Sequence, residues 1–361
     1  MIENNLATIP IFKSSLPRPE KWLDYLEIAY NNSKFSNFGE VSHMLEKRVA
    51  EFFGISEHNV VTCVNATQAL TGAVSTAKEN ALAWTIPSWT FTATPASMIS
   101  ANKDFYFSDI DLDWRVSPVT RDVNVVDVLP FGEGIDLSRL ENLCSGEVVI
   151  DAAASFDSLR FSNLSSIKRR FGLVVSFHPT KFPAGPEGAV FISNDSSWCR
   201  KFRYWTIFGM DERRESYFPG TNAKMNEMSA SVILSSLDSY YDVRLNLVES
   251  SNLALQLSNS LDFEVNGALQ KGFVSPYWII RSAENRIKLV EEVFKKNLIS
   301  TRRWWMFGCH KMDAYSKYSV GNLEVTENAS QTSIGLPFYP DMSLEDWERI
   351  SSALKQCVVN A

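Results

Sequence analysis

Lys181 stands in a sequence context that favours chemistry at its side-chain amine. The apolar run Leu173–Phe177 predicts a buried strand, and His178-Pro179-Thr180 carries that strand into a turn ending at Lys181. A tight loop follows over 183–188, and Ala189–Ile192 resumes as a strand. A lysine held at the end of a buried strand lies over a pocket, where loss of water makes the amine a usable nucleophile towards an aldehyde. A surface lysine on a hairpin explains this segment equally well.

Asp151 ends a second apolar run, Val148–Ile150, and the small residues Ala152–Ala154 follow it. A carboxylate at that place can pair with the protonated ring nitrogen of a pyridine cofactor and keep the ring electron-withdrawing. Taken alone, the pattern more often indicates an aspartate that caps the next helix. The residues themselves leave both interpretations open.

A phosphate site is indicated where the strand Asn59–Val64 turns into a helix, at Asn65-Ala66-Thr67. Backbone N–H groups at a helix start, with the Thr67 hydroxyl beside them, form a cradle for phosphate. Ser176 adds a second hydroxyl from its own strand end. Simple capping of the helix by Asn65 or Thr67 is the alternative.

The segment Pro87-Ser88-Trp89-Thr90-Phe91 follows another strand end and offers an aromatic face for stacking on a flat ring. A position in the core is the alternative for these aromatic residues. The four segments indicate a binding site more strongly together than singly. Each lies at the predicted carboxyl end of a strand, where open α/β sheets bind ligands. Together they supply a phosphate site, a stacking face, a partner for a ring nitrogen and an amine.

The elements that would position these residues alternate between strands and helices. Val41–Phe53 has apolar residues at helical spacing and ends before Gly54. Further short apolar runs, at Leu82–Ile86, Phe105–Phe107 and Val123–Leu129, predict strands separated by helix-compatible segments. The alternation predicts an α/β fold with a mostly parallel sheet.

The last part of the chain has a different character. Helical patterns run over 225–237 and 238–261, and a short strand is predicted at Trp278–Arg281. Two more helices are predicted over 286–296 and 344–357. We therefore predict a large domain over residues 1–240 and a smaller α+β domain over 241–361.

The bulk composition predicts a soluble protein of the cytoplasm. The 42 acidic and 35 basic side chains give a net charge of −7, which provides no general attraction to nucleic acid or anionic membranes. No apolar stretch approaches the roughly 18 residues of a membrane span, and the N-terminus lacks the basic start of a signal peptide. Five scattered cysteines without a CxxC pair fit reduced thiols, and four histidines show no metal spacing. Asp109, Asp111 and Asp113 are interpreted as a solvated turn rather than a calcium loop.

The motifs resemble the DegT/DnrJ/StrS family of sugar aminotransferases, which are fold-type I pyridoxal-phosphate (PLP) enzymes. The most specific match is Ser176-Phe177-His178-Pro179-Thr180-Lys181 followed by Pro186-Glu187-Gly188. Asp151-Ala152-Ala153, the segment 87–91 and the segment 220–228 match in order and spacing. The resemblance extends from Asn37-Phe38-Gly39 to the segment 336–340, which is nearly the whole chain.

The resemblance implies a mostly parallel seven-stranded sheet flanked by helices, with a smaller C-terminal α+β domain. It also implies that Lys181 forms the internal aldimine with PLP and that Asp151 pairs with the pyridine nitrogen. Phe91 would stack on the cofactor ring, with Trp89 close by. The phosphate would be held by Ala66, Thr67 and Ser176, and by Asn222 of a neighbouring subunit. That last role implies a homodimer with two shared active sites.

Some positions depart from the family pattern. Ala154 stands where the family has Gln or His near the ring oxygen, and Ser155 or a water would have to substitute. Lys224 replaces an arginine, which keeps the charge and loses the bidentate fork. The resemblance places the stretch with Arg303 and His310 near the sugar end, where arginines would suit a diphosphate. The neighbouring pair Trp304-Trp305 fits a core or interface role equally well. Trp89, Lys224, Arg303 and His310 are thus the predicted substrate contacts.

The implied activity is transfer of an amino group from L-glutamate to a nucleotide-linked keto-sugar, with a 4-keto-6-deoxyhexose as the expected acceptor and a 3-keto sugar as the alternative. Cell-surface polysaccharide synthesis, such as that of O-antigen, is the usual setting of such relatives. A PLP-dependent sugar dehydratase is a second hypothesis, but those relatives carry His in place of the lysine, so Lys181 argues against it. A non-catalytic regulator that binds PLP or sugar is a third, supported by Ala154 and Lys224. A dehydrogenase has no support, since the chain contains no GxGxxG segment.

Overall fold

The computed structural model describes residues 7–118, 120–318 and 321–359. Its main sheet has seven strands in the order β1-β7-β6-β5-β4-β2-β3. The strand β7 is antiparallel to both of its neighbours, and the other neighbouring pairs with a recorded register are parallel. The strands are β1 (Val60–Cys63), β2 (Trp84–Pro87), β3 (Phe105–Ser108), β4 (Asn124–Val128), β5 (Val148–Asp151), β6 (Gly172–Ser176) and β7 (Ala189–Ser193). The predicted mostly parallel α/β sheet is thereby confirmed.

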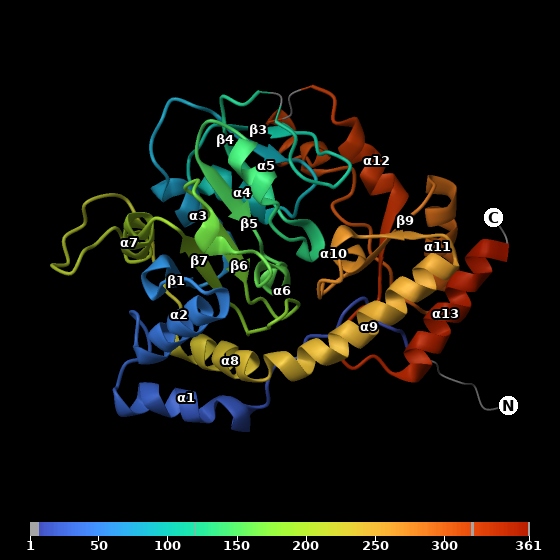
Figure 1. The fold of residues 1–361 in the computed structure, drawn as a ribbon, viewed down its shortest axis with the longest axis horizontal. Helices are drawn as coiled ribbons and strands as arrows, with labels where there is room; N and C mark the ends of the chain where they lie inside the picture. The colour runs from blue at the N-terminus through green and yellow to red at the C-terminus, as the bar shows by residue number, and fades with distance from the viewer. Residues whose placement is uncertain (1–6, 119, 319–320, 360–361) are drawn as a thin grey trace.

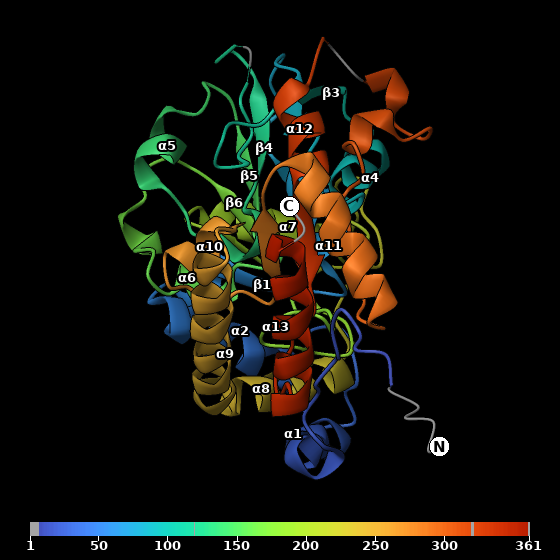
Figure 2. The same cartoon turned by 90° about the vertical axis from the view of Figure 1, so that its right-hand side faces the viewer.

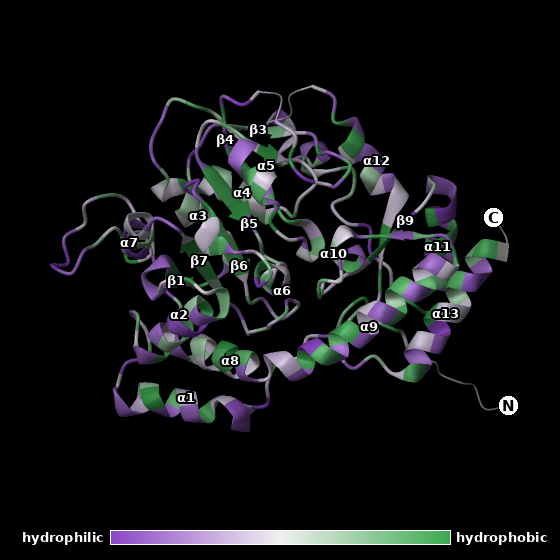
Figure 3. Cartoon of the chain, in the orientation of Figure 1, coloured by the Kyte–Doolittle hydropathy of each residue, from purple (hydrophilic) through white to green (hydrophobic). Residues whose placement is uncertain are grey.

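The strands of this sheet are nearly continuous apolar runs because both of its faces are covered (Figures 1 and 3). Alternate residues of β5 show this: Val148 and Ile150 face one hydrophobic cluster, and Val149 faces the other. The first cluster includes α2 (Glu40–Phe53), α5 (Leu137–Asn142), α6 (Phe156–Leu159) and α8 (Glu227–Asp238). The second includes α3 (Ala66–Thr76), α4 (Ala93–Ser100) and α7 (Ser196–Trp205).

A buried carboxylate connects α2 to α8. Glu227, at the start of α8, accepts hydrogen bonds from the amides of Val41 at 2.8 Å and of Gly39 and Ser42 at 3.2 Å. These amides belong to the first turn of α2, which has no side-chain cap of its own. Gly39 permits the approach, because a Cβ there would lie 2.5 Å from the Glu227 carboxyl. The far end of α2 stops as predicted, with Gly54 in the left-handed region at φ 64°.

The C-terminal part of the chain forms a second, smaller sheet in the order β10-β9-β8, with both pairs antiparallel. Long helices flank it (Figures 1 and 2). The elements are α9 (Tyr240–Ser260), β8 (Glu264–Val265), α10 (Gly267–Gln270), β9 (Trp278–Arg281), α11 (Glu284–Lys296), α12 (Glu324–Thr332), β10 (Ser333–Leu336) and α13 (Leu344–Val359). The division at residue 240 falls at the start of α9 and stays a prediction. One contact crosses this division near the start of the chain, where Ile9 pairs with Ile299.

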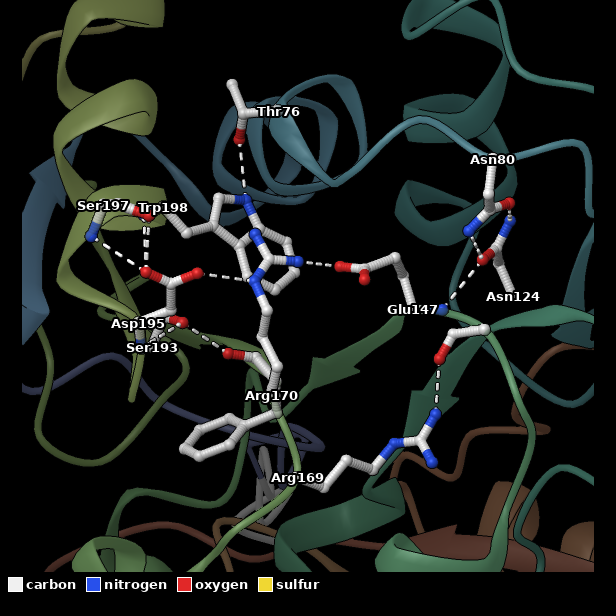
Figure 4. A network of polar contacts seen from close by, with 12 residues as sticks. Thr76, Asn80, Asn124, Glu147, Arg169, Arg170, Ser193, Asp195, Ser197 and Trp198 are labelled. Carbon is white, nitrogen blue, oxygen red and sulfur yellow. Dashed lines mark hydrogen bonds and ion pairs between the residues drawn. The ribbon is translucent and has the colours of Figure 1, made fainter.

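A polar network holds the amino ends of β4, β5 and β6, at the edge opposite the carboxyl ends (Figure 4). The guanidinium of Arg170 lies over the ring of Trp198 at 3.8 Å and contacts both Glu147 and Asp195. Although burial acts in the opposite direction, hydrogen bonds from Ser197 and Arg170 lower the pKa of Asp195 to about 2. This edge is therefore fixed by structural ion pairs.

The structure also shows the surroundings of the cysteines and of the acidic segment Asp109–Asp113. All five cysteines are buried and unpaired. Within the described ranges, no helix is long and apolar enough to cross a membrane, and no cluster of three or more His, Cys, Asp or Glu side chains could hold a metal ion. Asp109 receives hydrogen bonds from the amides of Val325 and Thr326, and Asp111 pairs with Arg139. These two acids therefore have structural partners.

Replacing Glu227 with Ala is expected to lower the free energy of unfolding by about 2–4 kcal/mol, because buried amides of α2 lose their acceptor. The measurement is the urea dependence of the far-ultraviolet circular dichroism. Glu51→Ala, at an exposed position of the same helix, is the matched control and should change stability by less than about 0.5 kcal/mol. Equal effects of the two variants would refute the capping role of Glu227.

Candidate active site

A cavity of about 400 Å³ lies at the carboxyl edge of the large sheet. The loops that follow β1, β2, β4, β5 and β6 all contribute to its wall, together with segments of the C-terminal part of the chain. Its lining includes Ala66, Thr67, Phe91, Phe131, Asp151, Ala154, Ser176, His178, Lys181, Tyr277, Arg302, Trp304 and Trp305. Six of the predicted cofactor contacts (Ala66, Thr67, Phe91, Asp151, Ser176 and Lys181) are therefore brought together at one place.

Lys181 ends a tight turn after β6, in which its amide donates to the carbonyl of His178 at 2.8 Å. The next residue, Phe182, anchors the turn by stacking on Tyr240 with ring centroids 4.9 Å apart. Gly185 brings the chain back against α8, because a Cβ there would lie 2.4 Å from Ile233. The Lys181 amine points into the cavity, and its Nζ lies 2.6 Å from the Tyr277 hydroxyl. Lys181 therefore lies at the cavity, and the interpretation as a surface lysine on a hairpin is wrong.

Asp151 is a buried acid at the end of β5. Its carboxylate accepts from the Thr94 hydroxyl at 3.0 Å and from the Ala153 amide at 3.2 Å. Burial raises its pKa, and the two hydrogen bonds and the charge of Lys181 only partly oppose that effect. The next helix, α6, begins after Ser155, so Asp151 does not cap it. Its position favours a partner inside the cavity.

The amino end of α3 forms another wall of the cavity. The Asn65 side chain accepts from the Gln68 amide at 2.9 Å, so the capping interpretation of Asn65 is confirmed. The next two residues, Ala66 and Thr67, line the cavity at the positive end of the helix dipole. Ser176 contributes from the end of β6. This end of the cavity suits a phosphate group.

The rings of Phe131, Trp304 and Trp305 form another wall of the cavity, the aromatic wall. Phe131 stacks on Trp305 with centroids 4.9 Å apart and an interplanar angle of 12°. Tyr277 and Trp304 meet edge to face at 5.0 Å. Phe91 lines the cavity with 54% of its surface exposed, as a ring available for stacking would.

None of the four predicted substrate contacts lines the cavity, and three of them are buried or paired elsewhere. Trp89 is fully buried behind the aromatic wall, 5.2 Å from Trp305, which matches the alternative of a core residue. Arg303 turns away to pair with Glu291 and with backbone carbonyls. His310 is buried against Ser88 at 2.6 Å, and burial lowers its pKa. The side chains of Trp89, Arg303 and His310 therefore have their contacts outside the cavity.

Asn222 and Lys224 also lie outside the cavity lining, in contact with each other. They follow a loop that projects from the body of the molecule after α7 (Figure 1), in which Phe208 and Tyr217 are about half exposed. This is consistent with the expectation that Asn222 acts in a neighbouring subunit, which stays a prediction.

Sequence patterns missed several residues of the site. Thr94 and Thr90 form a hydroxyl pair at 2.7 Å that leads to Asp151. Tyr277 reaches Lys181 from a segment 96 residues away. Thr90 lies in the loop before α4 and Thr94 in the first turn of that helix, so no regular spacing signals this pair. No local signal pointed to Tyr277, because its role depends on the contact between distant parts of the chain.

The model of the DegT/DnrJ/EryC1/StrS aminotransferase family matches residues 19–355. The chain belongs to this family. It is 24% identical to a dTDP-4-amino-4,6-dideoxy-D-glucose transaminase of Shigella dysenteriae, over 96% of this chain and 99% of that protein. A Bacillus cereus structure assigned as a PLP-dependent aminotransferase superposes with a TM-score of 0.85 at 25% identity, over 97% of this chain and all of the other. The structure of DesI in the presence of its TDP-sugar product gives a TM-score of 0.80 at 25% identity, over 96% and 94% of the two chains.

The cavity residues of this family member fit PLP. A buried carboxylate with a raised pKa lacks a full counter-charge, and a protonated pyridine nitrogen would supply it. The amino end of α3 and Ser176 would hold the phosphate, and the Lys181 amine would bind the aldehyde carbon. Phe91 is the exposed ring at the cavity and is therefore available to stack on the cofactor ring.

The Asp151→Asn variant is expected to be more stable than the native chain when both are free of PLP. Because burial raises the pKa of Asp151, ionisation of this acid costs folding free energy above pH 4, where the unfolded chain is already ionised. An effect of order 1 kcal/mol raises the midpoint of thermal unfolding by about 1–2 °C at pH 7.5 for a chain of 361 residues, and the gain disappears below about pH 4. Asp104→Asn, at an exposed position, is the control.

Addition of PLP should reverse this order. The native protein gains stability by binding the cofactor, and the Asp151→Asn variant gains less because the ring nitrogen loses its ionic partner. If the asparagine variant were the less stable protein without PLP, Asp151 would be a structural acid rather than a cofactor partner.

Proposed function

We propose that this PLP-dependent aminotransferase moves an amino group from L-glutamate to a nucleotide-linked 4-keto-6-deoxyhexose. The observation that carries the proposal is one cavity that holds the Lys181 amine, the buried Asp151 carboxylate and the amino end of α3. The family membership supports the transfer of an amino group. The names of the Shigella relative and of the DesI structure support a nucleotide-linked acceptor, and the former supports a 4-keto-6-deoxy sugar.

PLP, when bound, supplies an electron sink that accepts the charge left on a carbon atom after loss of its proton. Asp151 keeps a proton on the ring nitrogen, which is what makes the ring electron-withdrawing. The Lys181 amine, once released by the amino donor, is the group placed to take a proton from the donor carbon and to return it. The aromatic wall of Phe131, Trp304 and Trp305 excludes water from these proton transfers. The amino donor reacts first and the keto-sugar second, and in the second stage the same amine moves the proton in the opposite direction. This order of two half-reactions predicts ping-pong kinetics.

Arg302 is the cation best placed for the diphosphate of the sugar nucleotide. Unlike Arg303, it lines the cavity, and its side chain is exposed. Its guanidinium lies 4.5 Å from the ring of Trp304, which restricts its position without using its hydrogen-bond donors. A planar donor fork suits a phosphate group. Arg302 therefore replaces Arg303 in the proposed substrate site.

A homodimer with shared active sites is part of the proposal. Asn222 follows the projecting loop, and its side chain does not line the cavity of its own chain. In a two-fold dimer it would complete the phosphate site of the partner. We also propose a cytoplasmic enzyme that supplies amino-sugars to cell-surface polysaccharide. The dehydratase hypothesis is not favoured, because Lys181, which lines the cavity, stands where those relatives carry His.

Spectroscopy tests the reaction directly. The visible absorption band of the PLP-loaded protein should bleach on addition of L-glutamate and return on addition of a nucleotide-linked 4-keto-6-deoxyhexose. Lys181→Ala should lose both the band and the transfer, because the amine is absent. A band that ignores every amino donor would make the chain a non-catalytic binder. Recovery with a 3-keto sugar alone would change the acceptor.

Mixed dimers test the shared site. Lys181→Ala and Asn222→Ala homodimers should each have little activity, because every site carries one defect. After unfolding and refolding together, half of the dimers contain one native site, so that about a quarter of the native activity should return. Each variant refolded alone is the control. Failure to regain activity, with dimers present in sedimentation, would contradict the role of Asn222 across the interface.

A further inference from the structure

The hydroxyl of Tyr277 lies 2.6 Å from Nζ of Lys181, with the amine as donor. Tyr277 belongs to the segment before β9, whereas Lys181 belongs to the turn after β6. The amine also lies 5.1 Å from the centre of the Tyr277 ring. Among the hydrogen bonds of the described residues, this is the one that reaches the reactive nitrogen.

The backbone at Tyr277 is fixed by a buried serine. The Ser275 hydroxyl donates to the carbonyl of Phe131 at 2.6 Å and accepts from the Tyr277 amide at 3.0 Å. Phe131 lies in the loop after β4, so this hydroxyl connects the tyrosine segment to the large sheet. Gly132 allows the two segments to come close, because a Cβ there would lie 3.3 Å from Ser275 Cα and from the Ala154 carbonyl.

The ring of Tyr277 is fixed by the aromatic wall. It meets the edge of Trp304 at 5.0 Å and that of Phe131 at 5.7 Å. Trp304 is in turn seated on β10, where Gly335 leaves room for it: a Cβ there would lie 2.3 Å from the indole Nε1. Packing on these sides restricts the ring, so its hydroxyl has a defined direction towards Lys181.

We infer that Tyr277 is a further catalytic residue, whose hydroxyl oxygen holds the Lys181 amine and stabilises it while it carries the transferred proton. The inference rests on the proposed function, in which Lys181 moves that proton. When the neutral amine takes a proton from the donor carbon, it becomes an ammonium group with three N–H bonds. One of them is donated to the Tyr277 oxygen, which leaves another directed into the cavity for the return of the proton. No proton is lost or gained by the phenol in this sequence.

The test is Tyr277→Phe, which keeps the ring between Trp304 and Phe131 and removes only the hydroxyl. In stopped-flow measurements, the rate of band bleaching at saturating L-glutamate should fall about 10- to 100-fold. The glutamate concentration for half-saturation should change less than about threefold, because the hydroxyl contacts the amine rather than the donor. Tyr25→Phe is the matched control, since the Tyr25 hydroxyl bonds Asp238 outside the cavity.

A second measurement does not depend on turnover. The visible band of the PLP-loaded protein is titrated with pH in the absence of substrates. An oxygen that accepts from the lysine nitrogen favours its protonated form, so Tyr277→Phe should move the titration midpoint to lower pH by about half a unit or more. A purely structural role of the ring would leave the midpoint unchanged.

The outcomes separate the inference from the proposed function. If glutamate fails to bleach the native band, the aminotransferase proposal fails with it. If the native band bleaches while the Tyr277→Phe variant keeps the native rate or the native midpoint, Tyr277 is not catalytic and the proposed function stands. A midpoint that moves to higher pH would also overturn the inference, because the hydroxyl would then act as a donor to the nitrogen.

Discussion

The buried charge of Asp151 is the constraint on which the site depends. A carboxylate at the end of β5, covered by α4 and by the following loop, is poorly solvated, and its two hydrogen bonds do not restore the loss. The protein keeps an acid there at the expense of its own stability. A cation that entered the cavity would offset this loss, which is why the residue points to a pyridinium partner.

The geometry of a parallel sheet explains why much of the site could be predicted from sequence. Each of the segments at 65–67, 87–91, 151 and 176–181 follows an apolar run, and the carboxyl ends of parallel strands meet at one edge. In this chain the predicted carboxyl ends of the strands lie within one residue of the observed ends, so the residues that follow them could be grouped from the sequence. The same argument located Asp151 and Lys181, whose side chains share the cavity.

The sequence patterns indicated the right segments but could not tell which side chains of those segments point into the cavity. Arg302 and Arg303 are adjacent in an extended segment that pairs with Gly335, so their side chains point to opposite sides. Which of the two enters the cavity depends on the pairing register with β10, and no local pattern encodes that register. Trp89 and Phe91 present the same difficulty, since one is fully buried and the other half exposed in the same loop. Glu227 shows the limit in a third form, because its amide partners lie more than 180 residues away.

The aromatic wall connects the chemistry to the arrangement of the two parts of the chain. Lys181 and Asp151 come from the large sheet, but Tyr277 and Trp304 come from segments beside β9 and β10. The Ser275 hydroxyl joins these parts beside the cavity, and the pairing of Ile9 with Ile299 joins them again at the start of the chain. Because the reactive amine is held across this junction, a small shift of the C-terminal part would move the Tyr277 oxygen away from Nζ. The precision of the catalytic geometry therefore depends on long-range packing, whereas the presence of the catalytic groups depends on the local order of strands and turns.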